Sequence, residues 1–98
     1  MSQAVLATFP FTEQGAKNFL ELLASPDGLV KTRAFEGFRD IKVFMMEDNK
    51  TMVMHQVWDS KEAHQAYVGW RMETGLGDFF AEALEGEYKV EYLTAQNV

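Results

Sequence analysis

Hydrophobic and polar positions alternate with a period of two in four stretches of the chain, as they do in strands with two different faces. We expect these strands at "QAVLATF", "RDIKVFMM", "TMVMHQVW" and "EYKVEYLT", which are residues 3–9, 39–46, 51–58 and 87–94. Pro10 ends the first strand because proline has no N–H for a sheet ladder. "EDNK" is a turn signal, so the two middle strands are predicted to form a hairpin.

Between the strands the apolar period changes to that of a helix. One face repeats behind a Thr12 N-cap and predicts a helix over residues 13–24, through Ala16, Phe19, Leu20 and Leu23. A second face repeats behind the candidate N-caps Asp59 and Ser60, through Ala63, Ala66, Tyr67 and Trp70. Gly75 and Gly77 interrupt this second helix. The stretch "DFFAEALEG" after them reads as a further helical piece.

Residues 26–38 have no assigned conformation. Pro26 in "SPDG" ends the first helix, but a Ser-Pro pair also opens short turns, so "LVKTRAFEG" is left open. The remaining elements follow the order βαββαβ. We therefore predict an α+β ferredoxin-like sandwich, a four-stranded antiparallel sheet with helices on one face, as a single domain over residues 1–98.

The second, third and fourth strands of this sheet are apolar on both sides, although helices would cover only one. In the third strand, Val53 and Val57 alternate with Met52, Met54 and Trp58. A strand that is apolar on both faces needs cover on both. A second copy packed sheet to sheet provides it, so we expect a homodimer through the open sheet face. The alternative is that the exposed methionines are simply tolerated.

Composition excludes several classes of function. The chain has 15 acidic and 9 basic residues, a net charge of −6, and no basic cluster of the kind that binds nucleic acid. It has no cysteine, so a disulfide framework and a thiolate site are both excluded. No segment resembles a signal peptide or a membrane span, and we expect a cytoplasmic protein with no membrane partner.

The hairpin, the segment "VWDSKEAHQAYVGWRMETG" and the terminal "EYKVEYL" together resemble the antibiotic biosynthesis monooxygenase family of dimeric α/β-barrel proteins. The similarity centres on the end of the third strand and the helix after it, at Val57, Trp58, Ser60, Glu62, Ala63 and Tyr67. "TRAFEG" and "WRMETG" are similar to the corresponding segments of one subgroup. The resemblance implies the ferredoxin-like fold over nearly the whole chain.

The resemblance also implies a range of functions. Members include oxygenases that convert phenols or anthrones to quinones without metal or flavin, since the substrate anion itself supplies electrons to oxygen. We therefore expect a cofactor-independent monooxygenase-like protein for a small aromatic or quinol, with no cofactor and no metal. A non-catalytic dimeric ligand-binding or structural protein is the alternative. The resemblance implies that haem-degrading members carry an asparagine in the first strand and a histidine late in the second long helix. Here "VLATF" has no asparagine and no histidine follows His64, so haem degradation is not expected.

Polar candidates for the chemistry are few. His55 lies in the third strand and is either a base near neutral pH or a residue at a subunit boundary. His64 follows the Ala63 face and is expected to be solvated. The two histidines match no metal-ligand spacing. Arg33, in the unassigned segment, is a candidate to clamp a carboxylate or phenolate.

Four further residues are candidate substrate contacts. Trp58 is expected to pack in the core against the following helix, with ligand stacking as the alternative. Tyr67 and Trp70 are three residues apart, so they share a face that either stacks on a ligand or belongs to the core. Arg71 is a second candidate clamp for an anionic oxygen.

Overall fold

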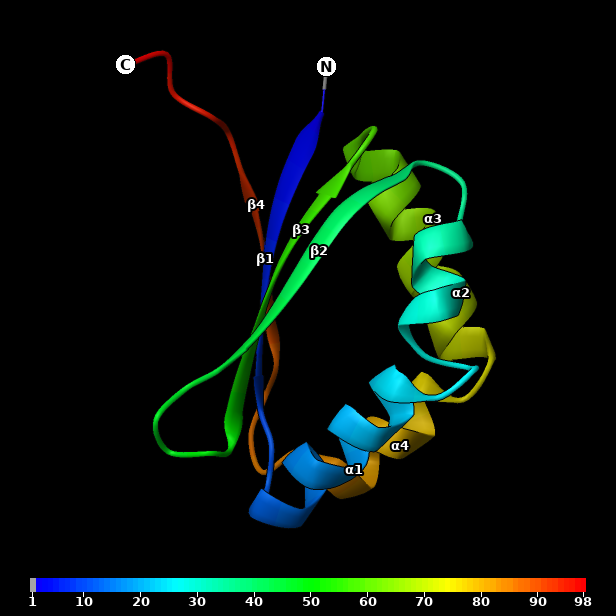
Figure 1. The fold of residues 1–98 in the computed structure, drawn as a ribbon, viewed down its shortest axis with the longest axis vertical. Coiled ribbons are helices and arrows are strands. Elements are labelled where there is room, and N and C mark those ends of the chain that lie inside the picture. The colour runs from blue at the N-terminus through cyan, green and yellow to red at the C-terminus, as the bar shows by residue number, and fades with distance from the viewer. Residues whose placement is uncertain (1) are drawn as a thin grey trace.

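The computed structural model describes residues 2–98 and contains four strands and four helices (Figure 1). The strands are β1 (Gln3–Pro10), β2 (Phe38–Met45), β3 (Thr51–Trp58) and β4 (Lys89–Leu93). The helices are α1 (Glu13–Ala24), α2 (Leu29–Ala34), α3 (Lys61–Glu73) and α4 (Leu76–Ala83). The predicted α+β ferredoxin-like fold is confirmed, and each crossover between strands carries a pair of helices.

The sheet has the strand order β2-β3-β1-β4, and every neighbouring pair is antiparallel. All four helices lie on one side of it (Figure 1). The register places Leu6 of β1 opposite His55 of β3 and Glu91 of β4. β2 and β3 are paired up to an irregularity between Phe38 and Asp40.

The two faces of the sheet differ in cover, as the alternation predicted. In β3 the side chains of Met52, Met54, Gln56 and Trp58 are buried beneath the helices, while those between them are only partly covered. We call the uncovered side the open face. It includes Ala4, Leu6, Thr8, Asp40, Lys42, Phe44, Val53, His55, Val57, Lys89, Glu91 and Leu93.

The two longer helices begin at the predicted caps. The Thr12 hydroxyl accepts a hydrogen bond from the Gly15 N–H at 2.9 Å, and the Ser60 hydroxyl accepts one from Ala63 at 3.1 Å. Gly15 also lets α1 approach α4 closely, because a Cβ there would stand 2.3 Å from the Ala83 carbonyl oxygen. The helices thus form a layer whose inner side faces the sheet.

Candidate functional site

A cavity of about 60 Å³ lies between the sheet and the helix layer. Every strand and every helix contributes to its wall. The lining residues are Ala7, Phe9, Phe19, Leu23, Leu29, Ile41, Met54, Gln56, His64, Tyr67, Val68, Arg71, Met72, Leu76, Phe80, Tyr88 and Val90. Most of these side chains are apolar, so the few polar ones determine how a ligand would be oriented.

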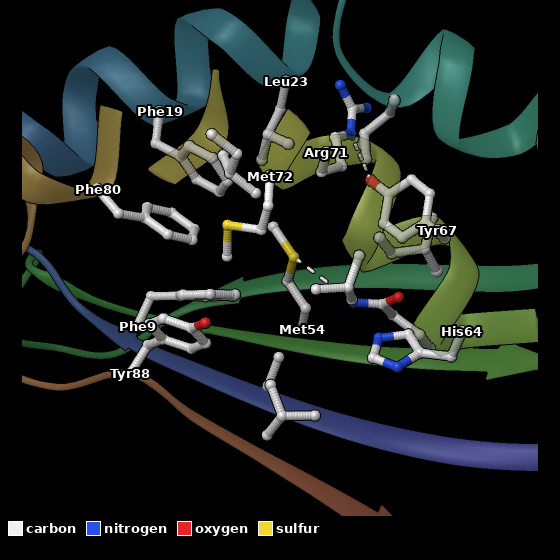
Figure 2. A pocket seen from close by; sticks show the side chains of 17 residues that line it. Phe9, Phe19, Leu23, Met54, His64, Tyr67, Arg71, Met72, Phe80 and Tyr88 are labelled. Atoms are coloured by element: carbon white, nitrogen blue, oxygen red, sulfur yellow. Dashed lines mark hydrogen bonds between the residues drawn. The ribbon is translucent and has the colours of Figure 1, made fainter. Parts of the chain in front are cut away.

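One end of the cavity is aromatic. The rings of Phe9 and Phe80 have centroids 5.3 Å apart, and Tyr88 lies 5.3 Å from Phe80 and 5.7 Å from Phe9. Phe19 closes the same cluster from α1, 6.0 Å from Phe9. Figure 2 shows these rings on one side of the cavity and the thioethers of Met54 and Met72 in its middle. An aromatic ring would find stacking partners at this end.

The other end is polar and carries the Gln56 amide. Gln56 is only 5% exposed. Its Oε1 accepts a hydrogen bond of 2.8 Å from Nε1 of Trp58, while its Nε2 has the Met54 sulfur at 3.9 Å. Because indole N–H is a donor only, this bond fixes which amide atom faces Trp58. The amide nitrogen is therefore the atom that remains beside Met54, in the cavity wall.

His64 lies at the same end and is only 2% exposed. Its Nδ1 is 2.8 Å from the hydroxyl of Tyr92, and its ring packs edge-on against Trp58 with centroids 5.8 Å apart. Burial lowers the pKa of His64, because the charged imidazolium loses its hydration. The expectation that His64 is solvated was wrong: α3 turns it toward the sheet (Figure 2).

A third polar group ties α3 to α2. Nε of Arg71 donates to the Tyr67 hydroxyl at 2.8 Å, and its two terminal nitrogens donate to the carbonyls of Asp27 and Gly28 and to the Thr32 hydroxyl, each at 2.8 Å. Tyr67 and Thr32 share a further hydrogen bond of 2.7 Å. Most donors of the guanidinium thus hold the short helix α2, in the segment whose conformation the sequence left open.

The aromatic candidates separate into core and surface. Trp58 is fully buried and packs against α3, with its ring 4.9 Å from that of Tyr67, as expected for a core residue. It stands behind Gln56 and His64 and does not line the cavity. Trp70 borders an outer groove of about 410 Å³, which meets the cavity at Arg71 and Leu76. Only Tyr67 and Arg71 of the four candidate contacts line the cavity itself.

The two candidates for catalysis lie elsewhere. His55 belongs to the open face, on the opposite side of the sheet from the cavity, between Leu6 of β1 and Lys42 of β2. Arg33 is exposed on α2 beside a shallow depression that also includes Val43. Neither side chain lines the cavity, so the structure gives neither a role in chemistry there.

Sequence reasoning missed Gln56 and the inward direction of His64. Two signals identify them. Gln56 occupies the same alternating face of β3 as Met54 and Trp58, where an amide requires a partner. The inner face of α3 repeats at i, i+3, i+4, i+7 and i+8, through His64, Tyr67, Val68, Arg71 and Met72. Three of these five residues, His64, Tyr67 and Arg71, are polar.

Two further properties bear on the classes of function. Within residues 2–98, no three histidine, aspartate or glutamate side chains come together as a group able to hold a metal ion. Over the same residues, none of the helices combines the length and the apolar character needed to cross a membrane.

The family model for antibiotic biosynthesis monooxygenase matches residues 2–70. No curated protein is similar enough in sequence to match. Several solved structures share the fold, among them a protein from Mycobacterium tuberculosis with 20% identity and a TM-score of 0.80, where the alignment covers 100% of this chain and 98% of that one.

Two oxygenases of Streptomyces have the same fold. The ActVA-Orf6 monooxygenase of Streptomyces coelicolor, solved with the ligand nanaomycin D, is 19% identical, with a TM-score of 0.78 and coverage of 99% of this chain and 89% of that one. SnoaB, a cofactor-independent oxygenase from Streptomyces nogalater, is 11% identical, with a TM-score of 0.73 and coverage of 99% and 95%. Identities this low establish a common fold alone.

Proposed function

The chain belongs to the antibiotic biosynthesis monooxygenase family, and we propose that it acts as a cofactor-independent monooxygenase on a small phenol or quinol bound in the cavity. The observation that carries the proposal is the division of this cavity into an aromatic end and a polar end. Phe9 and Phe80 offer stacking surfaces, while the buried side chains of Gln56 and His64 offer polar atoms in its wall. A phenol has the same division between ring and hydroxyl.

The proposed reaction needs only the substrate and dioxygen. A phenol is oxidised to a quinone while dioxygen is reduced: a C–O bond forms at a ring carbon, the O–O bond breaks, and the second oxygen atom leaves as water. The two hydrogen atoms in that water come from the phenolic O–H and from the ring C–H that is replaced. The protein's part is to hold the ring, ionise the hydroxyl and exclude solvent.

The size of the cavity favours a small substrate. A volume of about 60 Å³ has room for a few water molecules, whereas pockets for drug-sized ligands have about 300–1,000 Å³. Met54 and Met72 occupy the middle of the cavity, and methionine adapts easily to a changed neighbour. We therefore expect one-ring compounds to enter first, with the thioethers moving aside.

Oxygen uptake tests the proposal directly. Phenols and hydroquinones are added to the purified protein in an oxygen-electrode assay, and thermal stability is followed in parallel. Turnover that adds one oxygen atom from dioxygen, giving a quinone from a phenol or a hydroxyquinone from a hydroquinone, supports a monooxygenase. Thermal stabilisation without oxygen uptake would instead indicate the non-catalytic ligand-binding protein, and the absence of both would refute the use of the cavity for such compounds.

We also propose that the open face is the interface of a homodimer. Phe44 and Leu93 there are 53% and 41% exposed; Phe44 lies opposite the partly covered Val53, and Leu93 lies opposite Ala4. Exposed apolar side chains on an uncovered sheet face favour a partner surface over it. The dimer would have a mass of about 22 kDa, twice that of the chain.

A matched pair of substitutions tests the interface. Phe44→Asp places a charge on the open face, whereas Val30→Asp places one on an exposed apolar position of α2, away from it. In light scattering we expect the Phe44 variant to be monomeric and the Val30 variant to remain a dimer. A wild-type monomer at micromolar concentration would contradict the proposal.

A further inference from the structure

We propose that Gln56 and His64 together form a binding site for a single phenolic oxygen, in which the Gln56 amide donates a hydrogen bond to that oxygen and the imidazole accepts its proton. Tyr92 is the positioning residue that holds the imidazole. The inference rests on the proposed use of the cavity for a phenol, but not on the oxidation of that phenol.

Among the residues that the structure describes, the amide nitrogen of Gln56 has no oxygen or nitrogen atom as a hydrogen-bond acceptor. A buried carboxamide nitrogen normally donates to oxygen or nitrogen acceptors. Here Nε2 of Gln56 has only the Met54 sulfur, at 3.9 Å, which is a weak acceptor. The bond from Trp58 prevents the amide from turning over, because Nε1 of the indole needs the oxygen of Gln56. A ligand oxygen in the cavity would satisfy this nitrogen.

The His64 ring lies between Tyr92 and the cavity. Nδ1 is occupied by Tyr92, which does not itself line the cavity. The two ring nitrogens point in different directions, so Nε2 is the nitrogen available to a ligand (Figure 2). When Nδ1–H donates to the Tyr92 oxygen, Nε2 carries a lone pair and accepts a proton.

Burial keeps this imidazole neutral, so one ring nitrogen has a lone pair that can accept a hydrogen bond. Burial lowers the pKa of His64, so the ring is neutral at pH 7. The charged groups close by belong to the Tyr92 side: Nζ of Lys61 lies 4.8 Å from the centre of the Tyr92 ring, and Glu62 acts on the same phenol. Burial raises the pKa of Tyr92, so its hydroxyl keeps its proton at neutral pH.

Two other polar side chains of the cavity wall, those of Tyr67 and Arg71, already have hydrogen-bond partners, while the third, Tyr88, belongs to the aromatic end. The Tyr67 hydroxyl is hydrogen-bonded to both Thr32 and Arg71. The guanidinium of Arg71 donates to Tyr67, to Thr32 of α2 and to the carbonyls of Asp27 and Gly28. Gln56 and His64 both contact Trp58 and both line the cavity. One oxygen atom between them would donate its proton to His64 and accept from Gln56, and proton transfer would move that proton from the oxygen to Nε2.

The test compares phenol with toluene, which have the same ring and differ by a hydroxyl in place of a methyl group. Binding of each is measured under nitrogen, so that no oxidation takes place, using the wild type and the variant Gln56→Met. Gln14→Met, at an exposed amide of α1, is the matched control. We expect Gln56→Met to weaken phenol binding by about 3- to 10-fold, the effect of one lost hydrogen bond, and to leave toluene binding and the control unchanged.

Nuclear magnetic resonance of the ring nitrogens tests the histidine. The chain has only two histidines, and His55 on the open face is an internal reference. Phenol should shift the Nε2 signal of His64 and leave that of His55 unchanged. Toluene has no hydroxyl to bond Nε2, so it should not produce the shift that phenol produces at His64. Tyr92→Phe should alter the tautomer signature of His64 before any ligand is added.

The outcomes separate the two proposals. Equal affinity of the wild type for phenol and toluene would overturn the oxygen site, as would a phenol preference that Gln56→Met does not reduce or a His64 signal that does not respond. A selective phenol site without oxygen uptake in air would retain this inference and overturn the proposed oxidation. If neither compound binds, both fail.

Discussion

The hydrogen bond between Trp58 and Gln56 should be measurable as a coupling free energy. Trp58→Phe removes the indole N–H and leaves the buried Oε1 of Gln56 without its donor. Gln56→Met removes the acceptor in a side chain of similar length and leaves the indole N–H without a partner. The double variant removes both polar groups, so neither is left buried and unsatisfied.

The expected magnitudes follow from burial. An unsatisfied buried polar group costs about 1–3 kcal/mol, and both residues are nearly inaccessible to solvent. Trp58→Phe adds the loss of packing against Phe38 and Tyr67, so its total should be about 2–4 kcal/mol. Gln56→Met alone should cost about 1–2 kcal/mol. The double variant should cost about 1–3 kcal/mol less than the sum of the two single variants.

Urea unfolding gives the change in the free energy of unfolding for each single variant and for the double variant. The protein concentration is kept the same throughout, because the stability of a dimer depends on concentration. Each kcal/mol should also shift the melting temperature by about 4–8 °C for a domain of this size. Trp70→Phe, on the outer groove, is the control and should cost far less. If the two substitutions add to within about 0.5 kcal/mol, the indole does not orient the amide, and the argument for a free Nε2 in the cavity fails.

Three further results are expected from unfolding experiments. Gly15→Ala should destabilise by more than about 1 kcal/mol because its Cβ would collide with Ala83, whereas Gly69→Ala, with open space around it, should stabilise the helix by about 0.5–1 kcal/mol. Because the pKa of His64 is lowered in the folded state, the free energy of unfolding should fall as pH drops below the ordinary value of 6.5, and His64→Gln should reduce this dependence; an unchanged slope would contradict the burial. Backbone N–H groups lower the pKa of Asp48 to about 2, so its stabilising effect should persist at pH 4 and disappear as pH falls through 2, a loss that Asp48→Asn should abolish.

Local signals explain what the sequence predicted well. The bounds of α1 agree with the prediction because Thr12 and the "SPDG" turn mark its two ends and its apolar period is regular. The β2–β3 hairpin followed from alternation and a turn, which are also local. The existence of two differently covered faces in β3 needed only the period of two.

Long-range contacts explain what the sequence did not predict. α2 has no side-chain N-cap, and Arg71, more than forty residues later in the chain, holds its first turn. The inner face of α3 combines polar and apolar residues. The face predicted from hydrophobicity was therefore rotated by about one residue from the observed one, which placed His64 in solvent. The alternation in β3 could not say which side the helices cover, so it left the direction of His55 open.

The sheet order has a consequence for how the chain is made. Of the four strands, β1 is synthesised first and β4 last, yet β1 ends as an inner strand between β3 and β4. One of the two hydrogen-bonding edges of β1 therefore has no partner strand until β4 emerges. Contacts between such distant parts of a chain slow folding and leave strand edges open to other chains in the meantime. Truncation before residue 89 should thus turn a central strand into an exposed edge, and ribosome-bound chains of that length are expected to be the ones that need a chaperone.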